Sequence, residues 1–305
     1  MKIVFHVRGV VERAIRMFTT PGMSSMFIRW CFHSHGRRIT ILPGVSVGEL
    51  MSFSEFWSFR APVSSAERRF VKDLFSNTEG TGVAVDAGAN IGSFTLLFAS
   101  LGAKVHSFEP VPQTFVRLLK NIAFNGLDER CSPICAALGQ RNGIANFDID
   151  ETSSATNRAA VEDNAGNMHV AVFSLDEYCH RLCIERIDLL KVDVEGMEPD
   201  VLRGASCMLK ERRIKSILIE ICHTNLRSSG YSVAQLHSEI VSRGYGAYRL
   251  EGSGALGPIL ECSDLEAMTL ENVVLLPLPN QMYLSTAPQS LDSGTRSEHF
   301  RSQLS

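Results

Sequence analysis

Short apolar runs alternate with amphipathic segments through the middle of the chain. Runs rich in Val, Ile and Leu predict buried strands, at 83–87, 104–110, 131–139, 187–195, 215–221, 245–250 and 271–278. Segments with helical character lie between these runs, at 91–102, 111–127, 175–184, 196–211 and 233–244. Two further short strands are expected around a polar loop, at 145–149 and 169–173. Repeated strand–helix units predict an α/β fold, in which a mostly parallel sheet carries helices on both faces.

Three zones divide the chain. Residues 1–60 form an N-terminal extension that is basic in its first forty residues, which carry seven Lys or Arg and one acid. We expect this extension to pack on the core, and contact with an acidic membrane surface is the alternative. Residues 61–280 carry the strand–helix pattern and form the globular domain. Residues 281–305 are polar and have little apolar surface to bury, so we expect a disordered tail.

Composition and charge narrow the class of protein. The chain has 305 residues, 45% of them hydrophobic and 21% charged, which excludes collagen-like, coiled-coil and wholly disordered classes. A formal net charge of −3 argues against nucleic acid as a partner. No apolar run is long enough for a transmembrane helix, and charged residues interrupt the N-terminal segment where a signal peptide needs apolar ones. We therefore expect a cytoplasmic protein.

The eight cysteines give no strong metal signal, because none of them forms a C-x-x-C pair. Cys131 and Cys135 are four residues apart, as are Cys179 and Cys183, so a site with four thiolates is conceivable. Most of the cysteines lie in apolar runs, which favours buried free thiols in a reducing compartment. We expect no metal site.

The first predicted strand runs into a turn with the sequence Asp86-Ala87-Gly88-Ala89-Asn90-Ile91-Gly92. Two glycines permit a tight turn and a close approach of a ligand to the backbone. Ligands of doubly wound sheets bind beyond the carboxyl ends of the strands, where this turn lies. A pyrophosphate here would meet the carboxylate of Asp86, whereas the cationic cofactor S-adenosylmethionine suits an acid. The next strand ends at Glu109, which could accept both hydroxyls of an adenosine ribose, from NAD or from S-adenosylmethionine.

The two later strands also end in titratable residues. Alternation along 187–195 places Lys191, Asp193 and Glu195 on one side of the strand. An internal pair between the lysine and a carboxylate is the plain alternative to a functional role. The following strand ends at Glu220, close to His223, which could take a proton from an acceptor hydroxyl. A hydrogen-bonded structural histidine is the alternative.

Together these segments closely resemble the FkbM-type S-adenosylmethionine-dependent methyltransferases. The resemblance covers about residues 70–225 and rests on the strings VAVDAGANIGSFT, SFEPVP, LKNIAFNG, SLDEY, IDLLKVDVEGMEPDVLRGA and ILIEI. It implies a Rossmann-like seven-stranded sheet over 61–280, with an antiparallel last strand for which 271–278 is the candidate. It also implies methyl transfer to a hydroxyl of a sugar, a glycan or a secondary metabolite.

The resemblance assigns roles by motif. It places the methionine part of the cofactor against Asp86, Gly88, Asn90 and Gly92, and the ribose on Glu109. Asp193 and Glu195 would face the acceptor.

The candidate bases for the acceptor hydroxyl are His223, Asp193 and Glu220. We rank His223 first because it lies at the end of a strand. Two other functions stay open: an NAD-dependent oxidoreductase, against which the absence of G-x-G-x-x-G weighs, and a non-catalytic protein that keeps the fold.

Overall fold

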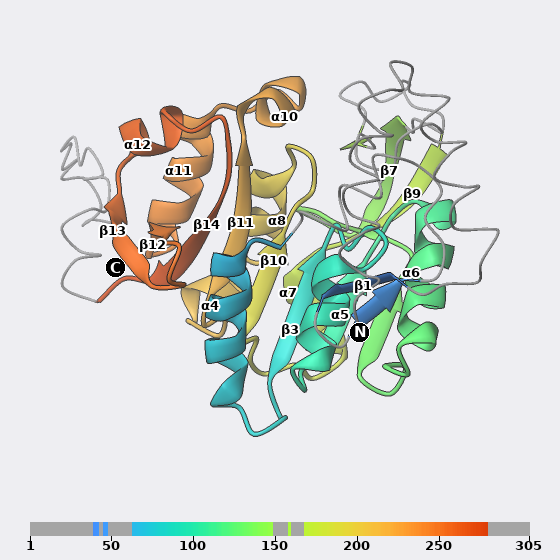
Figure 1. Ribbon diagram of the computed structural model, residues 1–305. Coiled ribbons are helices and arrows are strands. Elements are labelled where there is room, and N and C mark those ends of the chain that lie inside the picture. The colour runs from blue at the N-terminus through green and yellow to red at the C-terminus, as the bar shows by residue number, and fades with distance from the viewer. Residues whose placement is uncertain (1–38, 43–44, 48–62, 149–157, 160–167, 280–305) are drawn as a thin grey trace, which may run out of the picture.

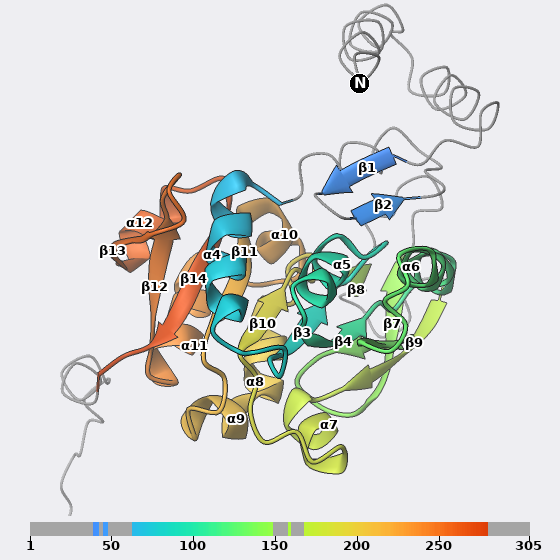
Figure 2. The ribbon, with the colours of Figure 1, turned by 60° about the horizontal axis from the view of Figure 1, so that its bottom comes forward.

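The computed structural model describes residues 39–42, 45–47, 63–148, 158–159 and 168–279 (Figure 1). Most of the predicted N-terminal extension and the whole predicted tail therefore lie outside the described residues. The short strands β1 (Ile39–Leu42) and β2 (Val45–Val47) belong to the extension and pair antiparallel. They lie beside helices α5 (Ser93–Ser100) and α6 (Pro112–Phe124), as Figure 2 shows.

A large sheet of eight strands forms the centre of the molecule. Its order is β13 (Leu256–Leu260), β12 (Tyr245–Leu250), β14 (Leu270–Pro277), β11 (Ile217–Cys222), β10 (Leu189–Val192), β3 (Val83–Ala87), β4 (Lys104–Phe108) and β5 (Cys131–Ile134). The five strands from β11 to β5 run parallel. The last strand, β14, runs antiparallel between β11 and β12, so this prediction and the mostly parallel Rossmann-like fold are confirmed.

The sheet has one strand more than the seven that were expected. β13 adds to the edge as an antiparallel partner of β12. It was missed because Gly257 and Pro258 stand inside a five-residue strand, and both residue types normally argue against a strand.

Helices cover both faces of the large sheet, and alternate residues of its strands divide the core between the two faces. Ala84, Leu189, Leu218 and Val274 pack with α4 (Ser65–Ser76), α5 and α6. The opposite face packs against α7 (Leu175–Arg181), α8 (Glu198–Gly204), α9 (Ser206–Lys210), α10 (His223–Ser228), α11 (Val233–Ser242) and α12 (Cys262–Glu266). Burial on both faces explains why the parallel strands have continuous apolar runs. Within the described ranges, no helix is long and apolar enough to cross a membrane.

A second sheet of four strands follows β5. Its order is β6 (Ala137–Leu138), β9 (Met168–Phe173), β7 (Gly143–Asp148) and β8 (Arg158–Ala159). The strands expected at 145–149 and 169–173 are confirmed as β7 and β9. The single strand expected over 131–139 is wrong, because the chain leaves the large sheet at Ile134 and joins the small one at Ala137.

Two other expectations need correction. The helix predicted over 196–211 is two helices, α8 and α9, that meet at Ala205, whose φ of −106° and ψ of 16° interrupt the helix. The described cysteines are free, but burial is confirmed only for Cys131 and Cys179. Cys222 and Cys262 are partly buried, and Cys135, Cys183 and Cys207 are exposed.

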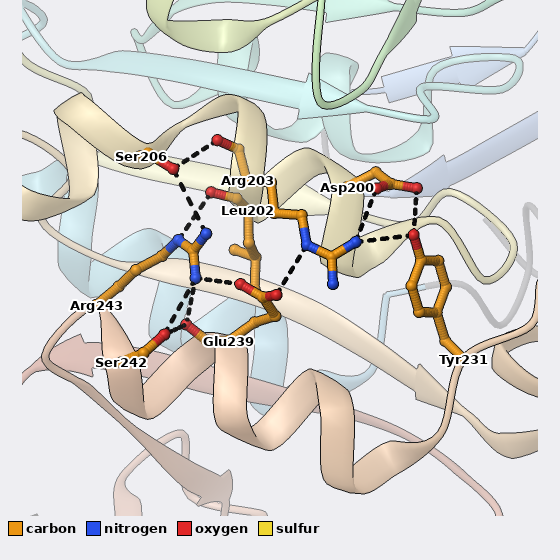
Figure 3. A network of polar contacts seen from close by, with 8 residues as sticks. All are labelled: Asp200, Leu202, Arg203, Ser206, Tyr231, Glu239, Ser242 and Arg243. Carbon is orange, nitrogen blue, oxygen red and sulfur yellow. Dashed lines mark hydrogen bonds and ion pairs between the residues drawn. The ribbon is translucent and has the colours of Figure 1, made fainter. Parts of the chain in front are cut away.

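Two arginines fix α8 to α11 (Figure 3). Arg203 on α8 donates to Glu239 on α11 at 2.8 Å and to Asp200, one turn earlier, at 3.2 Å. Arg243, which follows α11, donates to the carbonyl oxygen of Leu202 at 3.1 Å and also pairs with Glu239. These contacts hold the position of the helix that starts directly after the loop at the end of β10.

We predict that Gly204→Ala destabilises the fold. Gly204 is the last residue of α8, and a Cβ atom there would overlap the carbonyl oxygen of Gly139, which follows β6. Urea denaturation should show a loss of about 1–3 kcal/mol in the free energy of unfolding. Gly143→Ala is the matched control, because its Cβ would meet open space, and we expect a change within about 0.5 kcal/mol. Equal losses in the two variants would contradict the prediction.

Candidate active site

The predicted site residues meet at one edge of the large sheet. β10 pairs in parallel with β3 and β11, and β3 pairs in parallel with β4, so the four strands end at the same edge, here called the carboxyl edge. The predicted residues lie near the ends of these strands or just after them: Asp86, Gly88, Asn90, Gly92, Glu109, Asp193, Glu195, Glu220 and His223.

Asp86 is a fully buried carboxyl at the end of β3. The hydroxyl of Thr95, on α5, donates to Asp86 Oδ2 at 2.6 Å and lies 2.8 Å from the hydroxyl of Ser107 on β4. Burial raises the pKa of Asp86 to about 6, although the Thr95 bond and the charge of Lys191 act in the other direction. Its hydrogen bond to Thr95 ties the end of β3 to the first turn of α5.

The turn after β3 packs its backbone directly against the loop after β10. Gly88 has a φ of 79°, and a Cβ atom there would overlap the carbonyl oxygen of Asp193. Asn90 and Gly92 also have left-handed backbones, with φ values of 51° and 104°. Glycine at position 88 is therefore required by space as well as by conformation.

Glu109, directly after β4, holds this turn from the other side. Its Oε2 accepts from the Asn90 N–H and its Oε1 from the Val111 N–H, both at 2.9 Å. Only 6% of the residue is exposed, and burial raises the pKa of its carboxyl to about 7. Each oxygen retains a second lone pair, so the ionised carboxylate can still accept two hydroxyl groups.

A cluster of carboxyl groups follows β10 and lies beside the end of β11. It comprises Asp193, Glu195, Glu198 and Glu220. Glu195 has a left-handed φ of 53° and accepts from the side-chain amide of Asn225 on α10. Burial, followed by the charge of Asp193, raises the pKa of Glu195 to about 8. The same two causes raise the pKa of Glu220, which also shares a hydrogen bond with Asp193.

Glu198 belongs to this cluster but was missed from the sequence. In the sequence it falls in the first turn of the helix predicted over 196–211, where an acid is common for reasons of helix stability. Its Oε1 accepts from the backbone N–H groups of Val194 and Gly196, at 3.3 and 3.1 Å. Its Oε2 is the one buried side-chain N or O atom of the described residues that has no hydrogen-bond partner. Burial raises the pKa of Glu198 to about 7.

Lys191 forms the internal pair that the sequence left as the plain alternative. Its side chain is fully buried, and its Nζ lies 3.3 Å from Asp193 Oδ2. Strand β10 ends at Val192, so Glu195 does not continue the alternation that was expected for it.

His223 is the first residue of α10. Its Nε2 lies 3.1 Å from the carbonyl oxygen of Leu265 on α12. A carbonyl can only accept, so Nε2 carries the proton, and Nδ1 is the acceptor of the neutral ring. The role of His223 as a base stays a prediction. No three His, Cys, Asp or Glu side chains in the described part of the chain are arranged to hold a metal ion.

The donor set at the carboxyl edge fits a cationic adenosyl cofactor. Residues 86–92 and 109 include two carboxyls and no Lys or Arg, and the nearby Lys191 is paired with Asp193. A pyrophosphate would lie beside the carboxyl groups of Asp86 and Glu109, whereas sulfonium and ammonium groups would be attracted.

A family model described as Methyltransferase FkbM domain matches residues 86–246, just over half of the chain, which confirms the resemblance predicted from the motifs. Among curated proteins, the chain is 28% identical to a hexuronic acid methyltransferase of Haloferax volcanii, over 56% of this chain and 68% of that protein. It is 28% identical to a 2-O-methyltransferase of Sinorhizobium fredii, over 54% and 72%. It is 30% identical to a 31-O-demethyl-FK506 methyltransferase of Streptomyces tacrolimicus, over 40% and 58%.

We predict that Glu198→Gln stabilises the protein at alkaline pH. A raised pKa means that the folded state favours the protonated acid, so this group's contribution to stability is present below about pH 4.5 and is lost as the pH rises through about 7. Glutamine resembles the protonated acid at every pH. Chemical denaturation should give little difference at about pH 5 and about 1–3 kcal/mol in favour of the variant at about pH 8.

Glu129→Gln, at an exposed position, is the control for this comparison. A difference between wild type and Glu198→Gln that does not change with pH would contradict the assignment of a buried, proton-retaining carboxyl.

Proposed function

We propose, from the premise that this chain belongs to the FkbM methyltransferase family, that it transfers a methyl group from S-adenosylmethionine to a hydroxyl oxygen of a sugar, a glycan or a secondary metabolite. The observation that carries the proposal is the contact between two loops. The backbone of Gly88, in the turn expected to hold the cofactor, packs on the Asp193 carbonyl, in the loop expected to face the acceptor. The residues expected to bind the cofactor therefore lie next to those expected to face the acceptor.

The cofactor is assigned to residues around the ends of β3 and β4. Glu109 retains the lone pairs to accept the two ribose hydroxyls, and the turn from Gly88 to Gly92 lies beside it through the Asn90 N–H. When bound, S-adenosylmethionine supplies a methyl group already activated by a sulfonium. The protein then has to align the acceptor oxygen behind that carbon, and alignment of this kind can lower a barrier by ~7–11 kcal/mol.

A hydroxyl acceptor is favoured by the relatives and by the carboxyl cluster. The names of two relatives specify methylation at oxygen, and a third acts on a hexuronic acid. An alcohol must lose its proton during attack, which requires a base. Asp193 is the group we assign, because 31% of its side chain is exposed and its other side is fixed by Lys191. His223, which the sequence placed first, becomes the second candidate, because its Nε2 is bound to a backbone carbonyl.

The experiment that tests the proposal is a screen with methyl-labelled S-adenosylmethionine. The acceptors are methyl glycosides of neutral hexoses and hexuronic acids, lipid-linked glycans and macrolide alcohols. Mass spectrometry and NMR of the products identify the acceptor and the methylated atom. We expect a methyl ether on a hydroxyl. A methyl ester, an N-methyl product or no cofactor-dependent product in any class would contradict the proposal.

We predict that Glu109→Gln weakens the binding of S-adenosylmethionine by roughly tenfold or more, because a charged acceptor of two hydroxyls is lost. In wild type, affinity should also fall as the pH drops through about 7, where Glu109 takes up a proton. The variant should lose that pH dependence. Isothermal titration measures both effects. Glu185→Gln, an exposed residue just before β10 at the opposite edge, is the control and should bind like wild type.

We predict that Asp193→Asn lowers kcat by roughly 100-fold or more, the usual contribution of a general base, while cofactor binding is kept. His223→Gln should lower kcat by less than about tenfold. Both are measured at saturating cofactor with the acceptor found in the screen. The reverse order would assign the proton transfer to His223, and near-normal turnover in both variants would exclude both residues as the base.

A further inference from the structure

Lys191 is an unusual residue for the centre of a sheet. Its side chain has no exposed surface, and among the described residues it is the only buried Lys or Arg. A buried ammonium is costly unless its hydrogen bonds and its charge are satisfied. The contacts of Lys191 should therefore explain why a lysine stands there.

The Nζ group has three acceptors for its three protons. Asp193 Oδ2 lies at 3.3 Å, the side-chain oxygen of Asn272 at 3.1 Å and the carbonyl oxygen of Val192 at 3.4 Å. The ring of Phe94 lies below, with its centroid 5.1 Å away. This environment matches a charged ammonium, because a neutral amine would have only two protons for three acceptors.

Asn272, on β14, is itself fixed from a distant part of the chain. Its side-chain NH₂ donates to Glu67 Oε1 on α4 at 2.8 Å. Glu67 is buried, and its other oxygen accepts from the backbone N–H of Ser64 in the capping box of α4. A chain of polar contacts therefore runs from the start of α4 through β14 to Lys191 and ends on Asp193 at the carboxyl edge.

We propose that Lys191 is a positioning residue of the methyl-transfer site, whose buried ammonium, anchored by Asn272, fixes the Asp193 carboxylate at the carboxyl edge of the sheet. This inference rests on the proposed function. Lys191 does not touch the acceptor or the cofactor in this assignment, because it is fully buried behind Asp193.

The charge of Lys191 also acts on its neighbours. The charged groups that face it are Asp193, Glu220 on β11, Asp86 on β3 and Glu67 on α4. The carboxyl cluster adds Glu195 and Glu198, and the charge of Lys191 lowers the pKa values of Glu195 and Glu220 against the effect of burial. Loss of the ammonium should therefore make these two carboxyls hold their protons to a higher pH.

The test is an NMR titration of full-length protein with glutamate labelled at the carboxyl carbon. Glu195→Gln and Glu220→Gln assign the two signals. In Lys191→Met we expect both titration midpoints to rise by roughly one pH unit, whereas Lys191→Arg, which keeps the charge, should stay near wild type. Lys104→Met is the matched control at an exposed strand position and should leave both midpoints in place. Unchanged or lower midpoints in Lys191→Met would overturn the proposal.

If Lys191→Met does not fold, wild type still tests the proposal. The other described lysines are exposed, so with ¹⁵N-labelled lysine we expect one ammonium signal that exchanges slowly with water and persists to about pH 8. Absence of a slowly exchanging ammonium would overturn the assignment. Neither readout uses cofactor or acceptor. Failure of methyl transfer in the screen would therefore contradict only the proposed function. The NMR measurements test only the charge of Lys191 and its effect on the neighbouring carboxyls.

Discussion

The ion pair between Lys191 and Asp193 is the constraint on which the carboxyl edge depends. Five other carboxyls, including those of Asp86 and Glu109, lie at or near this edge, and burial raises the pKa of each of them. Lys191 is the only buried cation that the described residues place there. One ammonium cannot balance six carboxylates, and burial raises the pKa values of the other five carboxyls to between about 6 and about 8. This charge distribution supports the proposal that the edge binds a cationic ligand and takes up a proton.

Backbone contacts make the loops of this edge into one connected unit. Gly88 packs on the Asp193 carbonyl, and a Cβ atom at Gly196 would overlap the carbonyl of Asn225 on α10. Glu198 Oε1 accepts hydrogen bonds from the backbone N–H groups of Val194 and Gly196, in the loop after β10. The arginine contacts between α8 and α11 then fix the helix into which this loop runs. These contacts join the turn assigned to the cofactor to the loop after β10 and to α10, and rigid support of this kind is what the alignment of an acceptor needs.

The sequence predicted those features that depend on local pattern, and it failed where distant residues decide. Apolar runs located the strands of the large sheet except β13, because Gly257 and Pro258 interrupt its pattern. Asp86, Glu109 and Asp193 could be assigned to the site from the predicted ends of the strands, because parallel strands end at the same edge of a sheet. The alternation of side chains expected over 187–195 ends at Val192, where β10 ends, and Glu195 has a left-handed backbone. A two-residue pattern of apolar and polar positions gives no sign of such a backbone. The sequence suggested a carboxylate partner for Lys191 but not Asn272, which is 81 positions away from Lys191, nor the contact between Asn272 and Glu67, which are 205 positions apart.

The proposed function requires this acid-bearing edge to bind a cationic adenosyl cofactor rather than a dinucleotide. Glu109 alone does not distinguish the two, since both carry a ribose with free hydroxyls. The charge around the turn does distinguish them, because a pyrophosphate would be placed against carboxyls. The most direct measurement is a parallel calorimetric titration of the full chain with S-adenosylmethionine and with NAD. We expect S-adenosylmethionine to bind with a Kd on the order of micromolar, about −8 kcal/mol, and NAD to show no measurable binding. Preferential binding of NAD, or binding of neither, would contradict it.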